Sequence, residues 1–511
     1  MISRSRRNFV KTVVLGSGAL AFAGCQNERP PAGQQDLRHT LLSENFEACH
    51  QVRDGHRFEV PRASRRVEVA VIGGGPSGLI AAYRLRDRDV VLLEKESTLG
   101  GNARIDSWNG IPYAAGAIST AGNSPCMKLY EELGLQPLVI RRARGRPYLV
   151  NGKLYTDIWQ DGLEDLHAAP TRRRVRESRQ QLLDLDLSAR KTELDRVTLA
   201  SLLEPYGADV IGWYNDLLAW FGGTCEDYSG YAGTLLARSQ MGHNLSLLYP
   251  ERVEPEMNYT FPGGLAVAAL ALGRKIDEGG PQRIVTGAVV YRVAHDGDDV
   301  EVSYLHQGVP NTIRASVAIV AAPKYIARHV VADLPAGQKT AMSRFRYVPF
   351  LVGGVCTDGR VSDTVETARV LRGPIANLRT SGPGGAHEVY RCEAPLKKHM
   401  RPQVLTDEYI QRLATEIVEC FDSSFPGARQ RIQEVRIWRR GHNWYLPIPG
   451  MSTQFQPEAA RPFRRILFAN ADSAGEISEF GWALVAAERA VEGAEALLRS
   501  RAREITSGMG A

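Results

Sequence analysis

The feature that most restricts the fold of this 511-residue chain is a glycine-rich turn between two short apolar segments. Residues 67–72 are mostly β-branched and predict a strand, which leads directly into Gly-Gly-Gly-Pro-Ser-Gly at residues 73–78. Residues 79–86 predict an amphipathic helix, and residues 90–93 predict a second strand. This order of strand, glycine turn, helix and strand is typical of a βαβ unit that binds a dinucleotide.

Each glycine of the turn has a separate physical task in such a unit. Gly73 permits the tight turn, Gly75 lets the backbone approach a pyrophosphate, and Gly78 lets the helix pack closely against the strand. The amino terminus of the helix then offers free backbone N–H groups to the phosphates. Glu94 lies 21 residues after Gly73, where its carboxylate can accept hydrogen bonds from ribose hydroxyls. An acid at this position disfavours NADP, because the 2′-phosphate of NADP is itself negatively charged.

The charge of the chain gives no support to a nucleic-acid partner. The formal net charge is +6, but four of the 63 basic residues lie in the first 24 residues, which hold no acid. The other 59 basic residues are balanced by 57 acidic residues, so the body of the chain is close to neutral. A length of 511 residues that are 43% hydrophobic is sufficient for two packed domains.

The first 24 residues predict an export signal. Residues 5–11, Ser-Arg-Arg-Asn-Phe-Val-Lys, precede an apolar run at residues 13–23 that is too short to span a bilayer. The paired arginines resemble twin-arginine signals, which serve proteins that fold before they cross the membrane. The sequence Phe-Ala-Gly-Cys that ends at Cys25 resembles a lipoprotein cleavage box. Two outcomes stay open: a lipidated Cys25 that anchors the chain on the extracytoplasmic side, or cleavage near Ala23 and release into the periplasm.

Residues 25–64 are rich in Pro, Gln, Arg and Asp and predict a tether or an extended N-terminal arm. The chain has seven cysteines, and none stands at a metal-like Cys-x-x-Cys spacing, so no metal site is expected. Cys49 and His50 precede the predicted dinucleotide unit, and we expect them in a surface turn.

The residues after the second predicted strand resemble the flavin-containing amine oxidase and phytoene desaturase superfamily. Residues 99–104, Leu-Gly-Gly-Asn-Ala-Arg, are similar to the second glycine motif of that family, and residues 111–117 are similar to the segment that follows it. In the family, the paired glycines and a later Gly-Ala pair lie near the flavin. The resemblance therefore implies FAD as the cofactor.

Distant segments extend this resemblance discontinuously from about residue 67 to residue 498. Residues 315–323 resemble the returning strand of the family, and Val289 matches a valine whose backbone meets the adenine. Residues 466–472 predict a strand that ends on Asp472, which in the family hydrogen-bonds the ribityl or phosphate region. Residues 481–498 predict an Ala-rich helix whose start points N–H dipoles at the flavin in relatives. The residues expected to contact the cofactor are Gly73, Gly75, Pro76, Ser77, Gly78, Glu94, Lys95, Gly100, Gly101, Asn102, Gly116, Ala117, Val289, Ala322, Asp472, Trp482 and Ala483.

The expected fold class is α/β, with a discontinuous Rossmann-type FAD-binding domain and an inserted α+β substrate domain. The expected segments are a signal at 1–24, the arm at 25–64, the FAD-binding domain at 65–125, 258–335 and 462–500, the substrate domain at 126–257 and 336–461, and a tail at 501–511.

Aromatic residues are the candidates for substrate contact. Trp482 matches an aromatic that forms one wall of the amine oxidase cage, and Trp444 and Tyr445 lie where an opposing wall could originate. Aromatic faces attract an amine through cation–π interaction, whereas the alternative for each residue is an ordinary core aromatic. One departure from the family matters: typical amine oxidases carry a lysine on the strand after the Ala-x-Pro segment, and residues 346–355 contain none.

These observations favour an oxidoreductase that moves a hydride from an amine or a related C–H donor to flavin N5. Because no second dinucleotide motif follows a strand downstream, we expect the small-molecule substrate to supply the electrons and dioxygen, a quinone or a redox partner to accept them. The missing lysine keeps a desaturase or isomerase of an apolar substrate open. A non-catalytic lipid-anchored flavoprotein subunit and a secreted protein without a cofactor are the remaining alternatives.

Overall fold

The structure is a computed structural model that describes residues 37–122, 124–141, 147–242, 257–280, 283–362, 366–381 and 385–508. The predicted export signal, including Cys25, lies outside these residues, as does most of the glycine-rich stretch at 382–385. Among the residues that the structure describes, no helix combines the length and the apolar character needed to cross a membrane.

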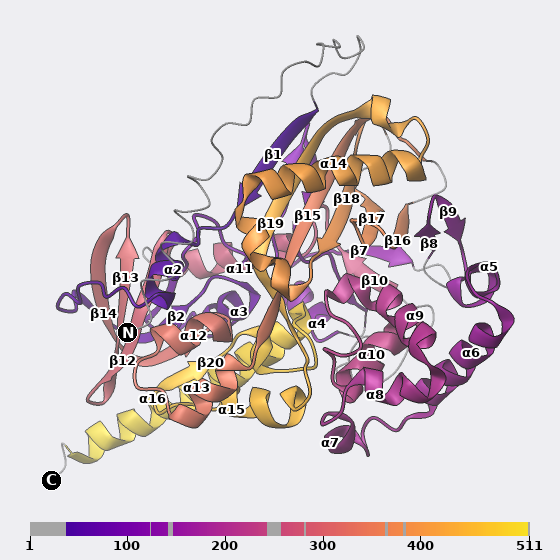
Figure 1. The fold of residues 1–511 in the computed structure, drawn as a ribbon. Coiled ribbons are helices and arrows are strands. Elements are labelled where there is room, and N and C mark those ends of the chain that lie inside the picture. Colours follow the sequence, from indigo (N-terminus) through magenta and orange to yellow (C-terminus); the bar gives the residue numbers. More distant parts are fainter. Residues whose placement is uncertain are drawn as a thin grey trace, which may run out of the picture. The chain divides into compact units, whose positions relative to one another are not determined.

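A seven-stranded sheet contains the predicted dinucleotide unit (Figure 1). Its strands are β2 (Arg65–Ile72), β3 (Val90–Leu93), β11 (Ile284–Val285), β12 (Ala288–Asp296), β13 (Asp299–His306), β14 (Val309–Val320) and β20 (Ile466–Phe468). The order is β11-β3-β2-β14-β13-β12, and β20 also pairs with β14. The contacts among β11, β3, β2, β14 and β20 are parallel, whereas β12, β13 and β14 form an antiparallel meander.

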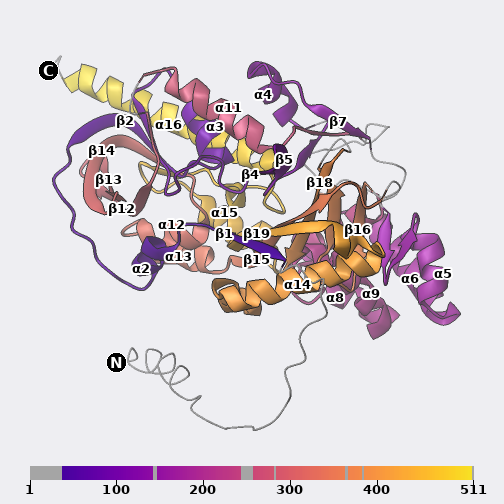
Figure 2. The same ribbon diagram turned by 90° about the horizontal axis from the view of Figure 1, so that it is seen from above.

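Helices cover both faces of the parallel part of this sheet (Figure 2). Val69 and Val71 of β2 pack with one group of helices, and the alternate residues Ala70 and Ile72 pack with another, as the two-residue period of a strand requires. The first group is α3 (Pro76–Arg84), α11 (Ala266–Asp277) and α16 (Phe480–Gly508); the second includes α12 (Lys324–Val330), α13 (Ala336–Ser343) and α15 (Gln456–Ala460). The Rossmann-type α/β fold is therefore confirmed.

An eight-stranded sheet is formed by segments that lie between and before those of the first sheet. In spatial order its strands are β1 (Arg38–Ser43), β19 (Ile432–Leu446), β15 (Arg346–Asp358), β18 (His387–Pro395), β17 (Asn377–Thr380), β16 (Thr367–Leu371), β8 (Tyr148–Val150) and β9 (Lys153–Tyr155). Helix α14 (Asp407–Ser424) lies across this sheet in Figure 1 and contacts β1 and β19. Smaller sheets pair β4 (Ile105–Trp108) with β5 (Ile111–Ala114) and place β10 (Met257–Thr260) between β6 (Ser119–Ala121) and β7 (Leu138–Arg141).

The remaining helices lie mostly between β9 and β10 in the sequence, as the helical pattern there predicts. They are α4 (Cys126–Glu132), α5 (Leu163–Leu166), α6 (Ala169–Asp184), α7 (Lys191–Leu194), α8 (Leu199–Leu203), α9 (Ala208–Leu218) and α10 (Gly230–Gln240). Most of them share a core around Trp213 and Tyr214. Helix α4 is different, because Cys126, Leu129 and Tyr130 pack into the core beside α3 and α16.

The described part of the N-terminal arm, residues 37–64, contains a strand and a helix that its composition did not predict. Strand β1 pairs in parallel with β19, from Arg38 opposite Glu434 to Ser43 opposite Arg439. Helix α2 (Glu47–Arg53) follows and contacts α12 and β12. Cys49 and His50 therefore lie in a helix, and the expectation of a surface turn is wrong. Local composition could not reveal this structure, because the strand that pairs with β1 lies almost 400 residues away in the sequence.

Candidate cofactor and substrate site

The first glycine turn has the close packing that a dinucleotide site requires. Gly73 has a φ of +107° and donates its N–H to the carbonyl oxygen of Leu93 at 2.8 Å. A Cβ atom on Gly78 would lie only 1.8 Å from the carbonyl oxygen of Gly73. A Cβ atom on Gly73 would also meet the backbone of Ala321 and Ala322 at 3.2–3.4 Å. Helix α3 therefore follows β2 at a distance that only glycine permits.

Gly75 differs from its neighbours because space is left above it. It is the N-cap of α3, Pro76 begins the helix, and no side chain caps this end. A Cβ atom on Gly75 would meet one atom within 4 Å, the Cα of Gly101 at 3.8 Å. An uncapped helix amino terminus with open space beside it fits a pyrophosphate, because N–H groups and the helix dipole favour anions there. Ser77 is buried in the same first turn.

Glu94 lies at the end of β3, close to the glycine turn. Its Oε2 accepts a hydrogen bond from the N–H of Gly74 at 2.5 Å, and its Oε1 accepts one from the N–H of Glu96 at 2.8 Å. Burial raises the pKa of Glu94, although both backbone hydrogen bonds oppose this change. Each carboxylate oxygen can accept a second hydrogen bond, so a ribose contact is compatible with this geometry. The N–H of Ala288 bonds to the carbonyl oxygen of Glu94, which places Val289 next to this strand end.

The second glycine motif packs directly on the first. Gly100 and Gly101 have φ values of +116° and +53°, and the N–H of Gly100 bonds to the carbonyl oxygen of Gly74 at 2.8 Å. A Cβ atom on Gly101 would lie 2.9 Å from the Cα of Gly75. The backbone of Asn102 continues the contact, because a Cβ atom on Gly116 would lie 1.9 Å from its carbonyl oxygen. The same oxygen accepts the N–H of Ala117 at 2.9 Å.

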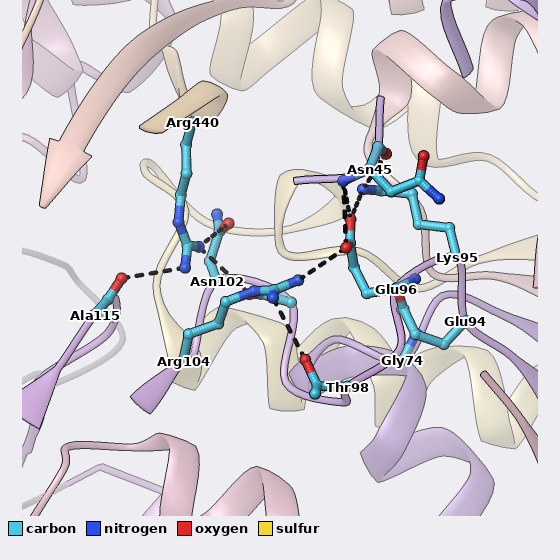
Figure 3. A network of polar contacts seen from close by, with 11 residues as sticks. Asn45, Gly74, Glu94, Lys95, Glu96, Thr98, Asn102, Arg104, Ala115 and Arg440 are labelled. Carbon is cyan, nitrogen blue, oxygen red and sulfur yellow. Dashed lines mark hydrogen bonds and ion pairs between the residues drawn. The ribbon is translucent and has the colours of Figure 1, made fainter. Parts of the chain in front are cut away.

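The three glycine segments predicted from the sequence therefore meet at one place, which lies at the carboxyl ends of β2 and β3. Figure 3 shows the polar residues around it. Lys95 contacts the carboxylate of Glu96 and donates to the carbonyl oxygen of Asn45 at 2.9 Å. The N–H of Asn45 donates to Glu96 at 3.0 Å, and Arg104 lies 3.7 Å from the same carboxylate. Lys95 thus holds the N-terminal arm against the site.

Two buried arginines that the sequence reasoning missed reach this cluster from the eight-stranded sheet. Arg391 of β18 donates to the carbonyl oxygens of Ala114 at 2.5 Å and Gly116 at 2.9 Å. Arg440 of β19 donates to the side chain of Asn102 at 2.6 Å and to the carbonyl oxygen of Ala115 at 3.1 Å. The signal that was available is weak: both are arginines inside segments that otherwise predict buried strands.

Asp472 has protein partners on both carboxylate oxygens. Oδ1 lies 2.7 Å from the Nζ of Lys324, and Oδ2 accepts the N–H of Lys324 at 2.8 Å and the hydroxyl of Tyr347. Lys324 also donates to Ser473 at 2.5 Å, and neither side chain of the ion pair is exposed. Burial lowers the pKa of Lys324, and Asp472 opposes this shift. The contact of Asp472 with a cofactor stays a prediction. The geometry shows a buried link between the start of α12, strand β15 and the turn that follows β20.

The aromatic candidates separate into two groups. The ring of Trp482 packs flat on Gly475, where a Cβ atom would lie 2.2 Å from the indole. The carbonyl oxygen of Gly475 accepts the hydroxyl of Tyr445 at 3.1 Å, and Gln456 donates to this hydroxyl at 2.9 Å. Tyr445 is only 1% exposed, and it is linked to Trp482 through Gly475. Ala483 donates its own N–H to Glu479 at 3.0 Å, so the free N–H groups of α16 belong to earlier residues.

Trp444 points away from Tyr445, as neighbouring residues of a strand must. Its indole N–H bonds to the carbonyl oxygen of Phe221 at 3.1 Å, and its ring packs with Trp220 and Phe350. A cavity of about 560 Å³ lies elsewhere, between β8, the end of β16 and α14. None of the predicted site residues lines that cavity.

Comparison with known families agrees with this geometry. A family model described as flavin containing amine oxidoreductase matches residues 76–493, which is more than half of the chain.

Solved structures share the fold over most of their length. Wild-type putrescine oxidase bound to putrescine superposes with a TM-score of 0.63 at 17% identity, covering 84% of this chain and 99% of that one. Cyclohexylamine oxidase from Brevibacterium oxydans superposes with a TM-score of 0.65 at 16% identity, covering 85% and 99%.

The curated relatives match only short segments. Oxidoreductase PigB from a Serratia species is 36% identical over 72 residues, which are 14% of this chain and 11% of the relative. Thiamine thiazole synthase from Desulfosudis oleivorans is 48% identical over 55 residues, which are 10% of this chain and 20% of the relative. The chain therefore spans about a tenth to a fifth of the length of these relatives.

The two classes of glycine in the first turn predict two different mutant phenotypes. Gly78→Ala should lower the free energy of unfolding by about 1–3 kcal/mol, because its methyl group has no space beside Gly73. Without FAD, Gly75→Ala should unfold at the same urea concentration as the wild type; with FAD bound, it should release the cofactor at least about tenfold faster, because its methyl group enters the open space. Urea denaturation and flavin fluorescence measure the two effects. Equal FAD release from Gly75→Ala and wild type would contradict the assignment.

The Lys324–Asp472 pair predicts a non-additive double mutant. Lys324→Met should lower the free energy of unfolding by about 3–5 kcal/mol, because it leaves a buried carboxylate without its countercharge. Combining it with Asp472→Asn removes both charges, so the double variant should be more stable than Lys324→Met alone. Urea denaturation of the four proteins measures the coupling. Additive losses would show that the pair is not coupled as the geometry indicates.

Proposed function

Because this chain belongs to the family of flavin-containing amine oxidoreductases, we propose that it is an exported FAD-dependent enzyme that oxidises an amine or a related C–H donor. The membership establishes an FAD-dependent oxidoreductase; export and the donor are the proposal. The observation that supports it is the meeting of three glycine segments at the uncapped start of α3, a helix that packs against α16, which carries the half-buried Trp482. Bound FAD supplies the acceptor for the hydride, at its N5 atom.

The main task of the protein's own residues is then to orient the substrate relative to the flavin. Oxidation of a neutral amine needs little acid or base catalysis, so the protein must hold the donor carbon in place in a site that excludes water. Trp482 is the residue that we assign to this contact. Its indole face attracts an ammonium group by cation–π interaction before the proton is lost. Gly475 and Tyr445 fix the position of this ring from the side that faces the core.

This arrangement changes the roles expected for the other two aromatic candidates. Tyr445 is a positioning residue in this proposal, because its side chain is buried and its hydroxyl is used by Gly475 and Gln456. Trp444 belongs to a separate aromatic group with Trp220. The proposed substrate contact therefore rests on Trp482.

One observation favours a second candidate, a desaturase or isomerase that acts on an apolar substrate. Strand β15 contains no lysine along its length, from Arg346 to Asp358. Lys324 cannot replace it as a free amine, because Lys324 is buried and paired with Asp472. A site without a free lysine is compatible with slow reaction with oxygen, in which case a quinone or a redox partner accepts the electrons.

A donor screen distinguishes the two functions. Anaerobic mixing of the purified holoenzyme with polyamines, monoamines and amino acids should bleach the flavin absorbance for at least one class of donor. Trp482→Leu should slow the bleaching about tenfold or more while FAD stays bound, since a desolvated cation–π contact contributes about 2 kcal/mol. Trp159→Leu, which removes a half-buried tryptophan from the helical segment, is the control. A panel that never bleaches the flavin would favour the apolar-substrate alternative.

Export is tested by the signal itself. Replacing Arg6 and Arg7 together by lysine should leave the precursor in the cytoplasm, whereas Arg4→Lys should be exported normally. Cell fractionation with immunoblotting measures both. Cys25→Ser then separates the two outcomes for the mature chain, because only a lipidated protein moves from the membrane to the soluble periplasmic fraction. Normal export of the double-lysine variant would contradict the twin-arginine route.

A further inference from the structure

Arg440 is a buried positive charge beside the glycine loops to which neither the family motifs nor the proposed function gives a role. The residue is 1% exposed and projects from β19 toward the loop at residues 100–102 (Figure 3). One terminal nitrogen donates to Asn102 at 2.6 Å and to the carbonyl oxygen of Gly101 at 3.4 Å. The other donates to Ala115 at 3.1 Å. All of these acceptors are neutral, and Nε has no partner in the described part of the chain.

Comparison with Arg391 shows that a buried arginine at this place can have an acidic partner, which Arg440 lacks within the described residues. Both guanidinium groups are buried, and both donate to the backbone between Ala114 and Gly116. Arg391 also forms an ion pair with Glu393, so its charge is balanced. Arg440 forms no such pair within the described residues, and burial lowers its pKa to about 10. More distant acids, Glu44 first among them, only partly offset this effect.

A buried cation without a countercharge is expensive to maintain, because it has lost its hydration and gained only neutral acceptors. The buried charge destabilises the folded protein much less when an anion pairs with it. No acid among the described residues forms an ion pair with Arg440, and the ligand of the site is therefore the source to consider.

The position of Arg440 indicates which anion this is. The loop that it contacts is the one that packs on Gly75, since a Cβ atom on Gly101 would lie 2.9 Å from the Cα of Gly75. Gly75 is also the N-cap of α3, whose first turn has no side-chain cap. The helix amino terminus at Gly75 and the guanidinium group of Arg440 are thus connected through Gly101, which contacts both.

We propose that Arg440 is a cofactor-binding residue whose guanidinium group neutralises the pyrophosphate of FAD, so that the eight-stranded sheet completes the dinucleotide site. FAD carries two negative charges at its pyrophosphate, and a buried guanidinium group binds phosphate oxygens more strongly than a neutral donor does. This inference rests on FAD as the cofactor but not on the identity of the substrate. A donor screen without any hit would therefore leave it intact.

The test measures retention of FAD by the purified holoenzyme. Arg440→Met removes the charge and should release FAD at least about tenfold faster on dilution, as the rise in flavin fluorescence reports. Arg440→Lys keeps a charge without the planar fork and should show an intermediate rate. ADP, which carries the pyrophosphate but no flavin, should slow the rebinding of released FAD, and Arg440→Met should require about ten times more ADP for the same effect. The absorption spectrum and midpoint potential of the retained flavin should be unchanged.

Arg439→Met is the matched control, because Arg439 is the adjacent arginine of β19 and pairs with Asp407 instead. It should release FAD at the wild-type rate. Wild-type release from Arg440→Met would overturn the proposal, as would equally fast release from Arg439→Met, which would indicate general loss of stability. A shifted flavin potential with normal ADP competition would also overturn it, since Arg440 would then act on the flavin ring. If Arg440→Met does not fold, a wild-type rate in Arg440→Lys together with unchanged ADP competition would have the same consequence.

Discussion

The contact between Gly78 and the carbonyl oxygen of Gly73 determines how the rest of the site is built. Because no side chain fits between them, α3 follows β2 without a gap, and its amino terminus is directed at the carboxyl edge of the sheet. There is no space for a side chain at Gly78, whereas open space remains beside Gly75. The second glycine motif then packs on this turn through Gly101. The close approach of Gly78 to Gly73 thus helps to position both glycine motifs, which are separated in the sequence by β3.

Polar side chains hold the two sheets together around this point. Residues 114–117 continue from the end of β5, and several of their carbonyl oxygens have no partner in a strand. Buried carbonyl groups need hydrogen-bond donors. Arg391 and Arg440 supply them from adjacent parts of the eight-stranded sheet. Tyr347 of β15 also joins the ion pair of Lys324 and Asp472. Both connections are buried and directional, so each restrains how the eight-stranded sheet packs against the dinucleotide unit.

The parts of the site that could be predicted from the sequence are those whose partners are close in the chain. Gly73, Gly78 and Glu94 lie within one βαβ unit, so spacing alone places them correctly. Resemblance to a family placed Gly100, Gly101 and Gly116, because their motif is also continuous. Where a partner is distant, prediction failed or was incomplete. Neither the ion pair of Lys324 nor the contacts of Arg440 has a local pattern, since each joins residues more than 140 positions apart.

The sequence also could not show which side chains are buried. Trp444 and Tyr445 are adjacent, and the sequence does not tell which of the two faces a site. The structure directs Tyr445 into the core and Trp444 toward Phe221. The polar composition of residues 25–64 was misleading for a similar reason. A parallel strand pairs through its backbone, so β1 needs only a few apolar side chains to join β19.

The pairing of β1 with β19 has a consequence for synthesis. The first strand of the described chain cannot find its partner until residue 446 has been made, which at 5–20 residues per second takes roughly 20–80 s. During that interval Leu41 and Leu42 have no sheet to join, and the edge of β19 does not yet exist. The pairing of β1 with β19 is consequently possible only late in synthesis. It joins the first strand of the described chain to the last strand but one.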